Sequence, residues 1–156
     1  MLYDYASDDG SQHASLYRDV IEGLRESVST HHAVSIVSLD DFIGNRALAP
    51  VDLLKIDVEG NELEVLRGAR QSLQKGTIQA IQFEFNEMNL VSRVFFKDFL
   101  DMLRGYRLFR LLPRGMLPVQ PYHPVLHELF GYQNIVAFRK GATAPGLSFP
   151  EERDLL

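Results

Sequence analysis

The chain has 156 residues, of which 46% are hydrophobic, which is the size and apolar content of one globular domain. Its formal net charge is -5 and its 16 Lys and Arg residues are scattered, so it lacks the basic stripe that nucleic-acid binding requires. The absence of cysteine excludes disulfides, thiolate metal sites and cysteine nucleophiles. The sequence has no apolar run of about 18 residues and no signal-peptide pattern, so we expect a cytoplasmic protein that does not span a membrane.

The first part of the chain gives weak local signals. Residues 1–12 are rich in Asp, Ser and Gly and predict a loop, apart from a short strand around Tyr3. Residues 15–28 place apolar side chains at helical spacing and predict one amphipathic helix. Residues 33–39 are β-branched and alternate in polarity, which predicts a strand, and a short helical turn is expected to follow at residues 40–45.

The centre of the chain predicts a strand followed by a helix. Residues 51–56 (VDLLKI) form a short apolar run, typical of an interior strand that is covered on both faces. Asn61 is a good N-cap and Glu64 lies where a capping-box partner belongs, so a helix is expected over residues 62–74. Gly76 should end this helix in the left-handed conformation.

Strands and helices then continue to alternate. A helix is predicted at residues 94–104, with Phe95, Phe96, Phe99, Leu100 and Leu103 as its buried side. Strands are predicted at residues 78–85, 106–112 and 133–138. This order predicts an α/β fold with a mostly parallel sheet and flanking helices over residues 1–140, followed by a flexible tail over residues 141–156.

Acidic and amide side chains follow the predicted strands, at the sheet edge where α/β folds bind ligands. Asp57 and Glu59 come after the strand that ends at Ile56, and Glu84 and Asn86 lie at the end of the next strand. Asp57 is either a helix N-cap or a carboxylate that faces a ligand. Glu59 is either a solvated loop residue or part of the same site.

Glu84 needs a partner because it lies between Phe83 and Phe85, where an isolated carboxylate would cost several kcal/mol. An ion pair with Lys55 on the adjacent strand is the structural interpretation. A functional role at the sheet edge is the other.

The run at residues 52–69, DLLKIDVEGNELEVLRGA, resembles the signature segment of the FkbM-like methyltransferases. The preceding SLDD and the later segments continue the likeness in the family's order, at residues 81–86 (IQFEFN), 105–111 (GYRLFRL) and 132–137 (YQNIVA). The resemblance extends roughly over residues 34–139 and corresponds to the carboxy-terminal part of that family.

This resemblance implies a partial Rossmann-like, class I methyltransferase sheet that moves a methyl group from S-adenosylmethionine to a hydroxyl, often of a sugar. It implies Asp57, Glu59, Glu84 and Asn86 as catalytic residues, and Asp57 and Asp40 as cofactor contacts. Methyl transfer is a displacement at a sulfonium carbon, so the protein aligns the acceptor oxygen and eases its deprotonation. Some metal-dependent O-methyltransferases of this fold place their ligands similarly, so Asp57, Glu84 and Asn86 are also a candidate Mg²⁺ site.

His123 and His127 lie with Tyr122 between the last two predicted strands. The spacing His-x3-His binds metal on a helix, but Pro121 and Pro124 argue against a helix there. We therefore favour a loop over the acceptor site, with one of the two histidines as a candidate base.

The sequence also departs from the family, because it has no GxG and no counterpart of the first three strands. We therefore expect that the amino-terminal strands and most of the cofactor-binding half are missing, and that this chain alone is incomplete. Without a first strand, residues 51–56 form a sheet edge unless residues 33–39 cover them, so we expect the chain to form a homodimer through that edge, to borrow a strand or to aggregate. Two alternatives are an inactive remnant that acts as a binding or dimerisation module, and a glycosyltransferase in which Asp57 and Glu59 hold a metal-nucleotide.

Overall fold

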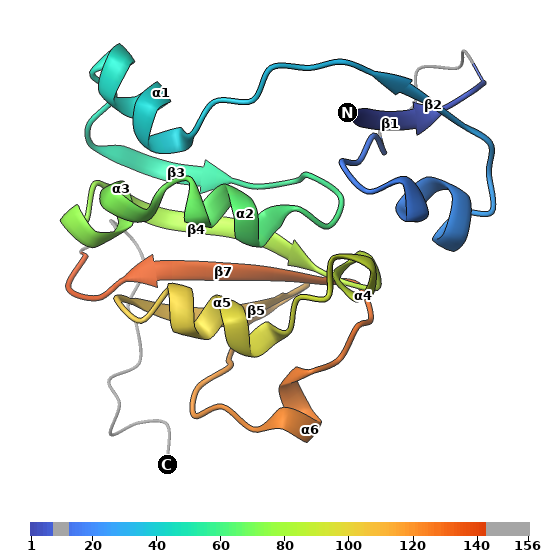
Figure 1. Ribbon diagram of the computed structural model, residues 1–156. Coiled ribbons are helices and arrows are strands. Elements are labelled where there is room, and N and C mark those ends of the chain that lie inside the picture. Colours follow the sequence, from blue (N-terminus) through green and yellow to red (C-terminus); the bar gives the residue numbers. More distant parts are fainter. Residues whose placement is uncertain (8–12, 143–156) are drawn as a thin grey trace.

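The computed structural model describes residues 1–7 and 13–142, which form a two-stranded and a five-stranded sheet with flanking helices (Figure 1). The predicted flexible tail falls mostly on residues 143–156, which lie outside the described residues. No helix in the described part of the chain is long and apolar enough to cross a membrane.

The small sheet pairs β1 (Leu2–Tyr5) with β2 (Ser29–His32) in antiparallel fashion, which confirms the short strand expected near the start. The strand expected over residues 33–39 is wrong, because these residues join no sheet. Helix α1 (Leu39–Arg46) begins after Ser38, whose hydroxyl accepts a hydrogen bond from the Asp41 backbone N–H at 3.1 Å. This N-cap starts a helix that runs slightly beyond the expected turn.

The long helix expected over residues 15–28 is also wrong. The helical residues are confined to 18–24, and η1 (Val20–Leu24) is a π-helix. Ser15 instead exchanges backbone hydrogen bonds with Tyr3, at 2.7 and 2.9 Å, and this bridge uses the backbone groups that a helix would need. The small sheet and η1 form a second core with α4 (Met88–Ser92), built on Val20, Ile21 and Met88.

In the large sheet, β3 (Val51–Lys55) pairs in parallel with β4 (Ile78–Phe85) and has no partner strand on its other side among the described residues. The prediction of an interior strand covered on both faces is therefore wrong, and Leu53 is 57% exposed. The expectation of a sheet edge at these residues is confirmed among the described residues, because residues 33–39 do not cover β3.

Two helices connect β3 to β4, where the sequence predicted a single helix. The break between α2 (Glu62–Arg67) and α3 (Arg70–Lys75) falls at Gly68 and Ala69. The capping box is wrong as well, because the Asn61 side chain makes no capping bond and instead accepts from the Tyr17 hydroxyl at 3.3 Å. Gly76 ends α3 with a φ of 68°, as expected.

The remaining elements follow the expected order with three additions. The expected elements are α5 (Phe96–Met102), β5 (Tyr106–Leu112) and β7 (Gln133–Arg139), and the additions are α4, β6 (Gly115–Pro118) and α6 (Pro124–His127). The argument that prolines exclude a helix near His123 is wrong. Pro124 occupies the first turn of α6, where no backbone N–H is needed.

The large sheet is mixed, in the order β3-β4-β7-β5-β6, so the α/β class is confirmed but the mostly parallel sheet is wrong. Only β3 and β4 pair in parallel. The last strand, β7, inserts between β4 and β5 and runs antiparallel to both, and the β5-β6 hairpin adds a third antiparallel ladder.

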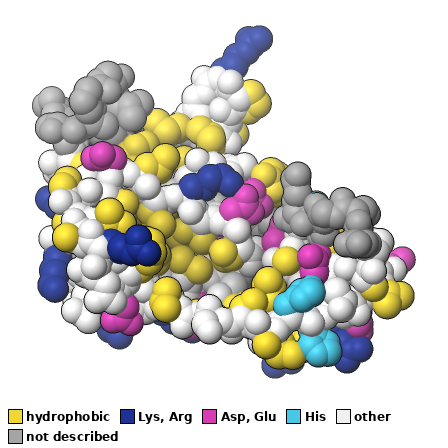
Figure 2. All heavy atoms as spheres, turned by 90° about the horizontal axis from the view of Figure 1, so that it is seen from above, with side chains coloured by type: hydrophobic (Ala, Val, Ile, Leu, Met, Phe, Trp, Pro, Cys, Tyr) yellow, Lys and Arg dark blue, Asp and Glu magenta, His cyan; other side chains and the backbone are white. Residues whose placement is uncertain are grey.

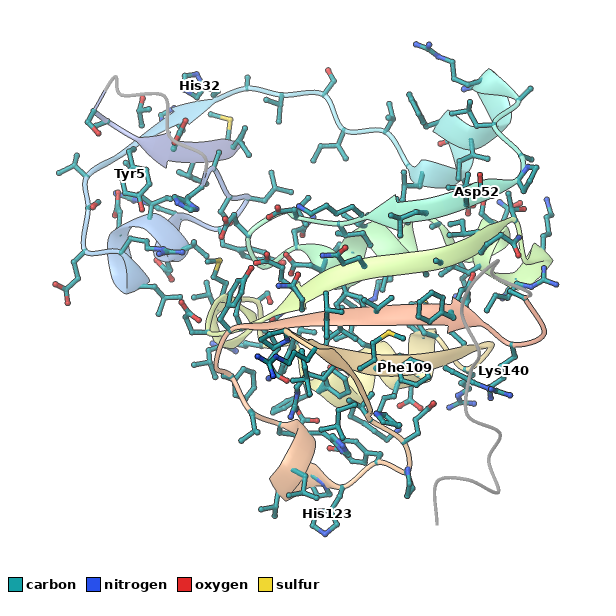
Figure 3. The ribbon with its side chains drawn as sticks, turned by 180° about the vertical axis from the view of Figure 1, so that it is seen from behind. Tyr5, His32, Asp52, Phe109, His123 and Lys140 are labelled. Carbon is teal, nitrogen blue, oxygen red and sulfur yellow. The ribbon has the colours of Figure 1, made fainter. Side chains whose placement is uncertain are left out.

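The two faces of the large sheet differ in their covering. Helices α2, α3 and α5 lie over one face (Figure 1), and the alternate β4 residues Ile81, Phe83 and Phe85 are fully buried there. Among the described residues no helix covers the other face, which is turned toward the viewer in Figure 3. Gln82 and Glu84 are only half-buried on that open face, so polar side chains there remain accessible.

Aromatic packing fixes α5 on the covered face. Phe99 stacks on Phe83 with ring centroids 4.5 Å apart, and Phe96 lies edge-on to Phe85 at 5.3 Å. The expected buried side of this helix is correct except for Phe95, which precedes α5 and is 55% exposed.

We expect Phe99→Ala to lower the free energy of unfolding by about 3–5 kcal/mol, because it removes a fully buried ring from a packed core. Urea unfolding followed by circular dichroism measures this change. The matched variant Phe95→Ala removes a mostly exposed ring and should cost less than about 1 kcal/mol. Similar losses for both variants would contradict the assignment of the core.

Candidate functional site

The carboxyl ends of β3 and β4 lie at one edge of the large sheet because the two strands are parallel. Lys55 pairs with Gln82, and the Ile56 backbone N–H donates to the Gln82 carbonyl at 2.7 Å, so Asp57 and Glu84 follow side by side. We call this edge the carboxyl rim and include in it Lys55, Asp57, Gln82, Glu84, Tyr132 and Asn134. Two strands therefore bring together the carboxylates that the sequence singled out.

Asp57 binds Lys55, not the N-terminus of a helix. The Lys55 Nζ lies 2.5 Å from the Asp57 Oδ2, and the Asp57 side chain is 46% exposed. The hydrogen bond from Lys55 to Asp57, followed by the attraction of Asp57 and then Glu84, raises the pKa of Lys55. An exposed pair of this kind contributes little to stability. Because its side chain is exposed, the Asp57 carboxylate is accessible to a ligand.

Glu84 accepts hydrogen bonds from neutral groups and makes no ion pair with Lys55, contrary to the structural interpretation. The Tyr132 hydroxyl donates to Glu84 Oε1 at 2.7 Å, and the Asn86 amide donates to Glu84 Oε2 at 3.4 Å. Asn134 donates to the Tyr132 oxygen at 3.2 Å, and Gln82 donates to Asn134 at 3.0 Å. The hydrogen bond to Glu84 is also the main reason that the pKa of Tyr132 is raised.

Asn86 is a buried residue that positions Glu84 at the rim. The residue is 3% exposed, and its Oδ1 accepts from the Met88 backbone N–H at 3.0 Å. Its own backbone N–H donates to Asn89 Oδ1 at 3.0 Å. These bonds fix the turn from β4 into α4, and the Asn86 amide then holds Glu84.

Glu59 is held by the amino-terminal part of the chain. His13 Nδ1 lies 3.0 Å from Glu59 Oε1, and the Ser15 hydroxyl donates to the Glu59 carbonyl at 2.8 Å. Glu59 has a φ of 53°, which is unusual for a residue with a side chain. Its second carboxylate oxygen, Oε2, is buried and has no hydrogen-bond partner among the described residues.

Glu62 is buried and binds the backbone of the loop that contains Glu59. It is 2% exposed, and its Oε1 accepts from the Gly60 backbone N–H at 3.1 Å. Burial, with a smaller contribution from Glu59, raises the pKa of Glu62 above its ordinary value of 4.5. Gly60 has a φ of 101°, and a Cβ there would lie 3.2 Å from the Met88 carbonyl oxygen. The acidic loop, residues 57–62, is therefore packed tightly against α4.

The structure does not bring Asp40 to the carboxyl rim. Its carboxylate accepts from the Ser72 backbone N–H and hydroxyl and from the Gln71 backbone N–H, at 2.8, 2.6 and 2.8 Å, and so caps α3. Burial acts to raise the pKa of Asp40, but these hydrogen bonds outweigh it and lower the pKa. Figure 1 shows α1 and α3 at the opposite end of β3 from the rim. The predicted contact of Asp40 with a cofactor stays a prediction.

His123 and His127 form a local structural pair. The His123 backbone N–H donates to His127 Nδ1 at 2.8 Å, and the His127 ring stacks with the rings of Phe96 and Tyr122. Burial, followed by the charge of Arg110, lowers the pKa of His127. His123 lies at the outer end of α6, away from β3 and β4 (Figure 3). No group of three or more His, Cys, Asp or Glu side chains in the described residues is arranged to hold a metal ion.

A groove of about 820 Å³ lies between the α2-α3 pair and α5, on the covered face. Its charged lining comes from Arg67, Arg70, Asp98, Asp101 and Arg104. Several of these residues are paired, as in the 3.1 Å contact between Arg104 and Asp101. We therefore assign the candidate site to the rim, where carboxylates face accessible space.

The sequence missed Tyr132, Asn134 and His13 as partners of the acidic residues. Asn134 pairs with Glu84 across the β4-β7 ladder, and Gln82 shares the face of Glu84 through strand alternation. Both relations require knowing that β7 lies beside β4. His13 is 46 residues from Glu59 in the sequence and carried no local signal.

Comparisons with known proteins point in one direction. A family model described as methyltransferase FkbM domain matches residues 2–108. The 2-O-methyltransferase NoeI of Sinorhizobium fredii (strain NBRC 101917 / NGR234) is 30% identical over 79 residues, which cover 50% of this chain. The chain spans only 32% of that curated relative. No solved structure gives a significant match.

We expect Glu62→Gln to stabilise the protein at neutral pH. Because the pKa of Glu62 is higher in the folded protein than in the unfolded chain, its protonated carboxyl stabilises the fold below about pH 4.5. This stabilisation is lost as the pH rises through the folded-state pKa, because the buried carboxyl must then ionise. The amide oxygen of Gln keeps the bond from Gly60 and carries no charge. Urea unfolding of both proteins across this range should show the advantage of the variant growing with pH.

The matched control is Glu64→Gln, which changes an exposed carboxylate in an ion pair with Arg67 on the same helix. Its effect should be small at every pH. A variant at Glu62 that is less stable than the wild type at pH 7 would contradict the argument.

Proposed function

Because the chain belongs to the FkbM methyltransferase family, we propose that it carries the acceptor side of an S-adenosylmethionine-dependent O-methyltransferase that acts on a sugar hydroxyl. The observation that supports this most is the pairing of β3 and β4, which sets the Lys55–Asp57 and Tyr132–Glu84 pairs side by side at one open rim. The similarity to a protein named as a 2-O-methyltransferase supports an oxygen acceptor.

Glu84 is the best candidate for the general base. When S-adenosylmethionine is bound, it supplies a methyl group on a sulfonium, and the acceptor oxygen must lose its proton as the new C–O bond forms and the C–S bond breaks. Among the described residues, the side chains that donate to Glu84 are neutral, whereas Asp57 is already bound to Lys55. A sugar hydroxyl that replaces the Tyr132 hydroxyl at Glu84 Oε1 would give its proton to that oxygen.

Tyr132 and Asn134 suit the binding of a sugar. Tyr132 is 66% exposed, so its ring offers a flat apolar surface beside a carboxylate and an amide. A tyrosine hydroxyl is protonated at neutral pH, so Tyr132 can donate to a sugar oxygen once it leaves Glu84. We propose that these two residues orient the acceptor and that Asn86 positions Glu84.

The acidic loop fits a positively charged cofactor. Asp57 is accessible at the rim, and the buried Glu59 Oε2 lacks a donor among the described residues. An ammonium or hydroxyl group would supply that donor, so Asp57 and Glu59 are the residues that we propose to hold S-adenosylmethionine.

The first test is the binding of S-adenosylmethionine to the full chain by isothermal titration calorimetry. We expect binding that weakens about tenfold in Asp57→Asn, because one accessible charge is lost. Asp52→Asn is the control, since Asp52 is an exposed carboxylate at the other end of the same strand. Absence of binding by the wild type would contradict the proposal for this chain and favour the binding-module alternative.

The second test is methyl transfer to oligosaccharides, detected by mass spectrometry. We expect Glu84→Gln to reduce the rate about 10²–10⁴-fold, which is the usual contribution of a general base. Glu64→Gln, on the exposed side of α2, should keep the wild-type rate. Full activity in Glu84→Gln would eliminate Glu84 as the base.

A further inference from the structure

A groove on the covered face forms a second cavity, separate from the carboxyl rim. It lies between the α2-α3 pair and α5, which Figure 1 shows side by side over the large sheet. Its volume of about 820 Å³ is within the range of small-molecule sites. None of the rim residues is among the described residues that line it, so the function proposed for the rim leaves the groove unexplained.

The floor of this groove is apolar. Leu63 and Tyr106 line it and are only 3% and 2% exposed, and the half-buried Leu73 and Met102 lie beside them. The Tyr106 hydroxyl donates to the Ile78 carbonyl at 2.8 Å, so its ring is fixed in place. The floor therefore offers a rigid apolar contact to a ligand.

The charged side chains around this floor carry an excess of positive charge. Among the described residues that line the groove, the charged ones are Arg67, Arg70, Arg104, Asp98 and Asp101. Both carboxylates already have partners: Asp98 accepts from the Phe95 backbone N–H at 2.9 Å, and Asp101 binds Lys97 at 2.6 Å. In a chain with a net charge of -5, this groove is therefore a place where an anion is favoured.

Arg70 is the arginine of this lining whose guanidinium is available to a ligand. Arg67 forms an ion pair with Glu64, and Arg104 lies 3.1 Å from Asp101. Arg70, the first residue of α3, is exposed, and its side chain forms no hydrogen bond or ion pair with another described residue. A planar guanidinium matches the oxygens of a phosphate-like group in pairs. Arg70 therefore supplies an anion-binding group at the edge of an apolar floor.

We propose that the groove binds a small amphiphilic anion, whose apolar ring system lies on the floor and whose phosphate-like group is held by Arg70. A small molecule fits better than a helix of a partner protein. Helix α5 has 7 residues and is about 10 Å long, so a partner helix lying along it would gain only about two turns of contact. A molecule of two fused rings with one charged group matches both the apolar floor and the unpaired Arg70.

Isothermal titration calorimetry of the full chain with 1-naphthyl phosphate tests the proposal. We expect one binding site per chain, and Arg70→Gln should raise the dissociation constant about tenfold because it removes a charge-assisted contact. Asp101→Asn should lower the dissociation constant about threefold, because Arg104 then lacks its partner and is available to the phosphate. Tighter binding of this kind cannot result from a loss of folding.

Arg114→Gln and Asp52→Asn are the matched controls, since they make the same charge changes in the β5-β6 turn and on β3, outside the groove. Neither should change the dissociation constant by more than about twofold. An unchanged urea midpoint shows that Arg70→Gln is folded. Wild-type affinity in Arg70→Gln, or equal effects in the controls and the groove variants, would overturn the proposal.

The two halves of the ligand are tested separately, because the chain has another exposed apolar surface. Figure 2 shows hydrophobic side chains over a hollowed surface on the side of the molecule seen from above. Phe42 and Leu53, which do not line the groove, are 42% and 57% exposed. 1-Naphthol, which lacks the phosphate, and inorganic phosphate, which lacks the rings, should each bind at least about tenfold more weakly than 1-naphthyl phosphate. Equally tight binding of either one would contradict an amphiphilic ligand.

Protection of an introduced thiol locates the site, and it is direct because the chain has no cysteine of its own. Gln74 is exposed and lines the groove, so Gln74→Cys should lose most of its reactivity toward a maleimide when 1-naphthyl phosphate is saturating. Val125→Cys, at a 74% exposed position on α6, should react at the same rate with and without the ligand. An unprotected thiol at residue 74 would place the ligand elsewhere and overturn the proposal. Neither measurement requires methyltransferase activity, so the outcome is separate from that of the proposed function.

Discussion

The parallel ladder between β3 and β4 is the constraint on which the candidate site depends. Parallel strands need a crossover, and here α2 and α3 provide it while burying Leu66 and Ala69 against the sheet. Both strands then end at the same edge of the sheet. The residues that follow them are therefore neighbours, even though no direct bond joins them. An antiparallel pair would have separated Asp57 and Glu84 by the length of the sheet.

The second condition is that only one face of the sheet is covered. Alternation along β4 sends Phe83 and Phe85 into the core and Gln82 and Glu84 to the open face. A helix over that face would bury Glu84 and would require a charged partner for it, because a buried carboxylate without one is costly. The open face instead lets the Tyr132 hydroxyl and the Asn86 amide satisfy the carboxylate while solvent and ligands still reach it.

The sequence predicts what depends on local patterns and misses what depends on pairing between distant segments. Period-two alternation identifies residues 78–85, and the left-handed position of Gly76 is predicted because few other residues adopt it. The insertion of β7 beside β4 and the capping of α3 by Asp40, 31 residues away, have no local signature. Residues 33–39 have the composition of a strand but join no ladder, because propensity cannot supply a partner.

The acidic loop concentrates features that cost stability. Glu59 has a positive φ, Glu62 is buried with a raised pKa, and each has a buried carboxylate oxygen without a partner among the described residues. Such costs persist only where surrounding packing holds the backbone in place. Here the support comes from α4 on one side and from Ser15 on the other. Helix α4 contributes Met88 to the small core built on Val20, Ile21 and Met88, and Ser15 is hydrogen-bonded to Tyr3, which packs against that core. The amino-terminal segment therefore holds the acidic loop in its conformation. Loss of its contacts should make the loop mobile before the large sheet unfolds.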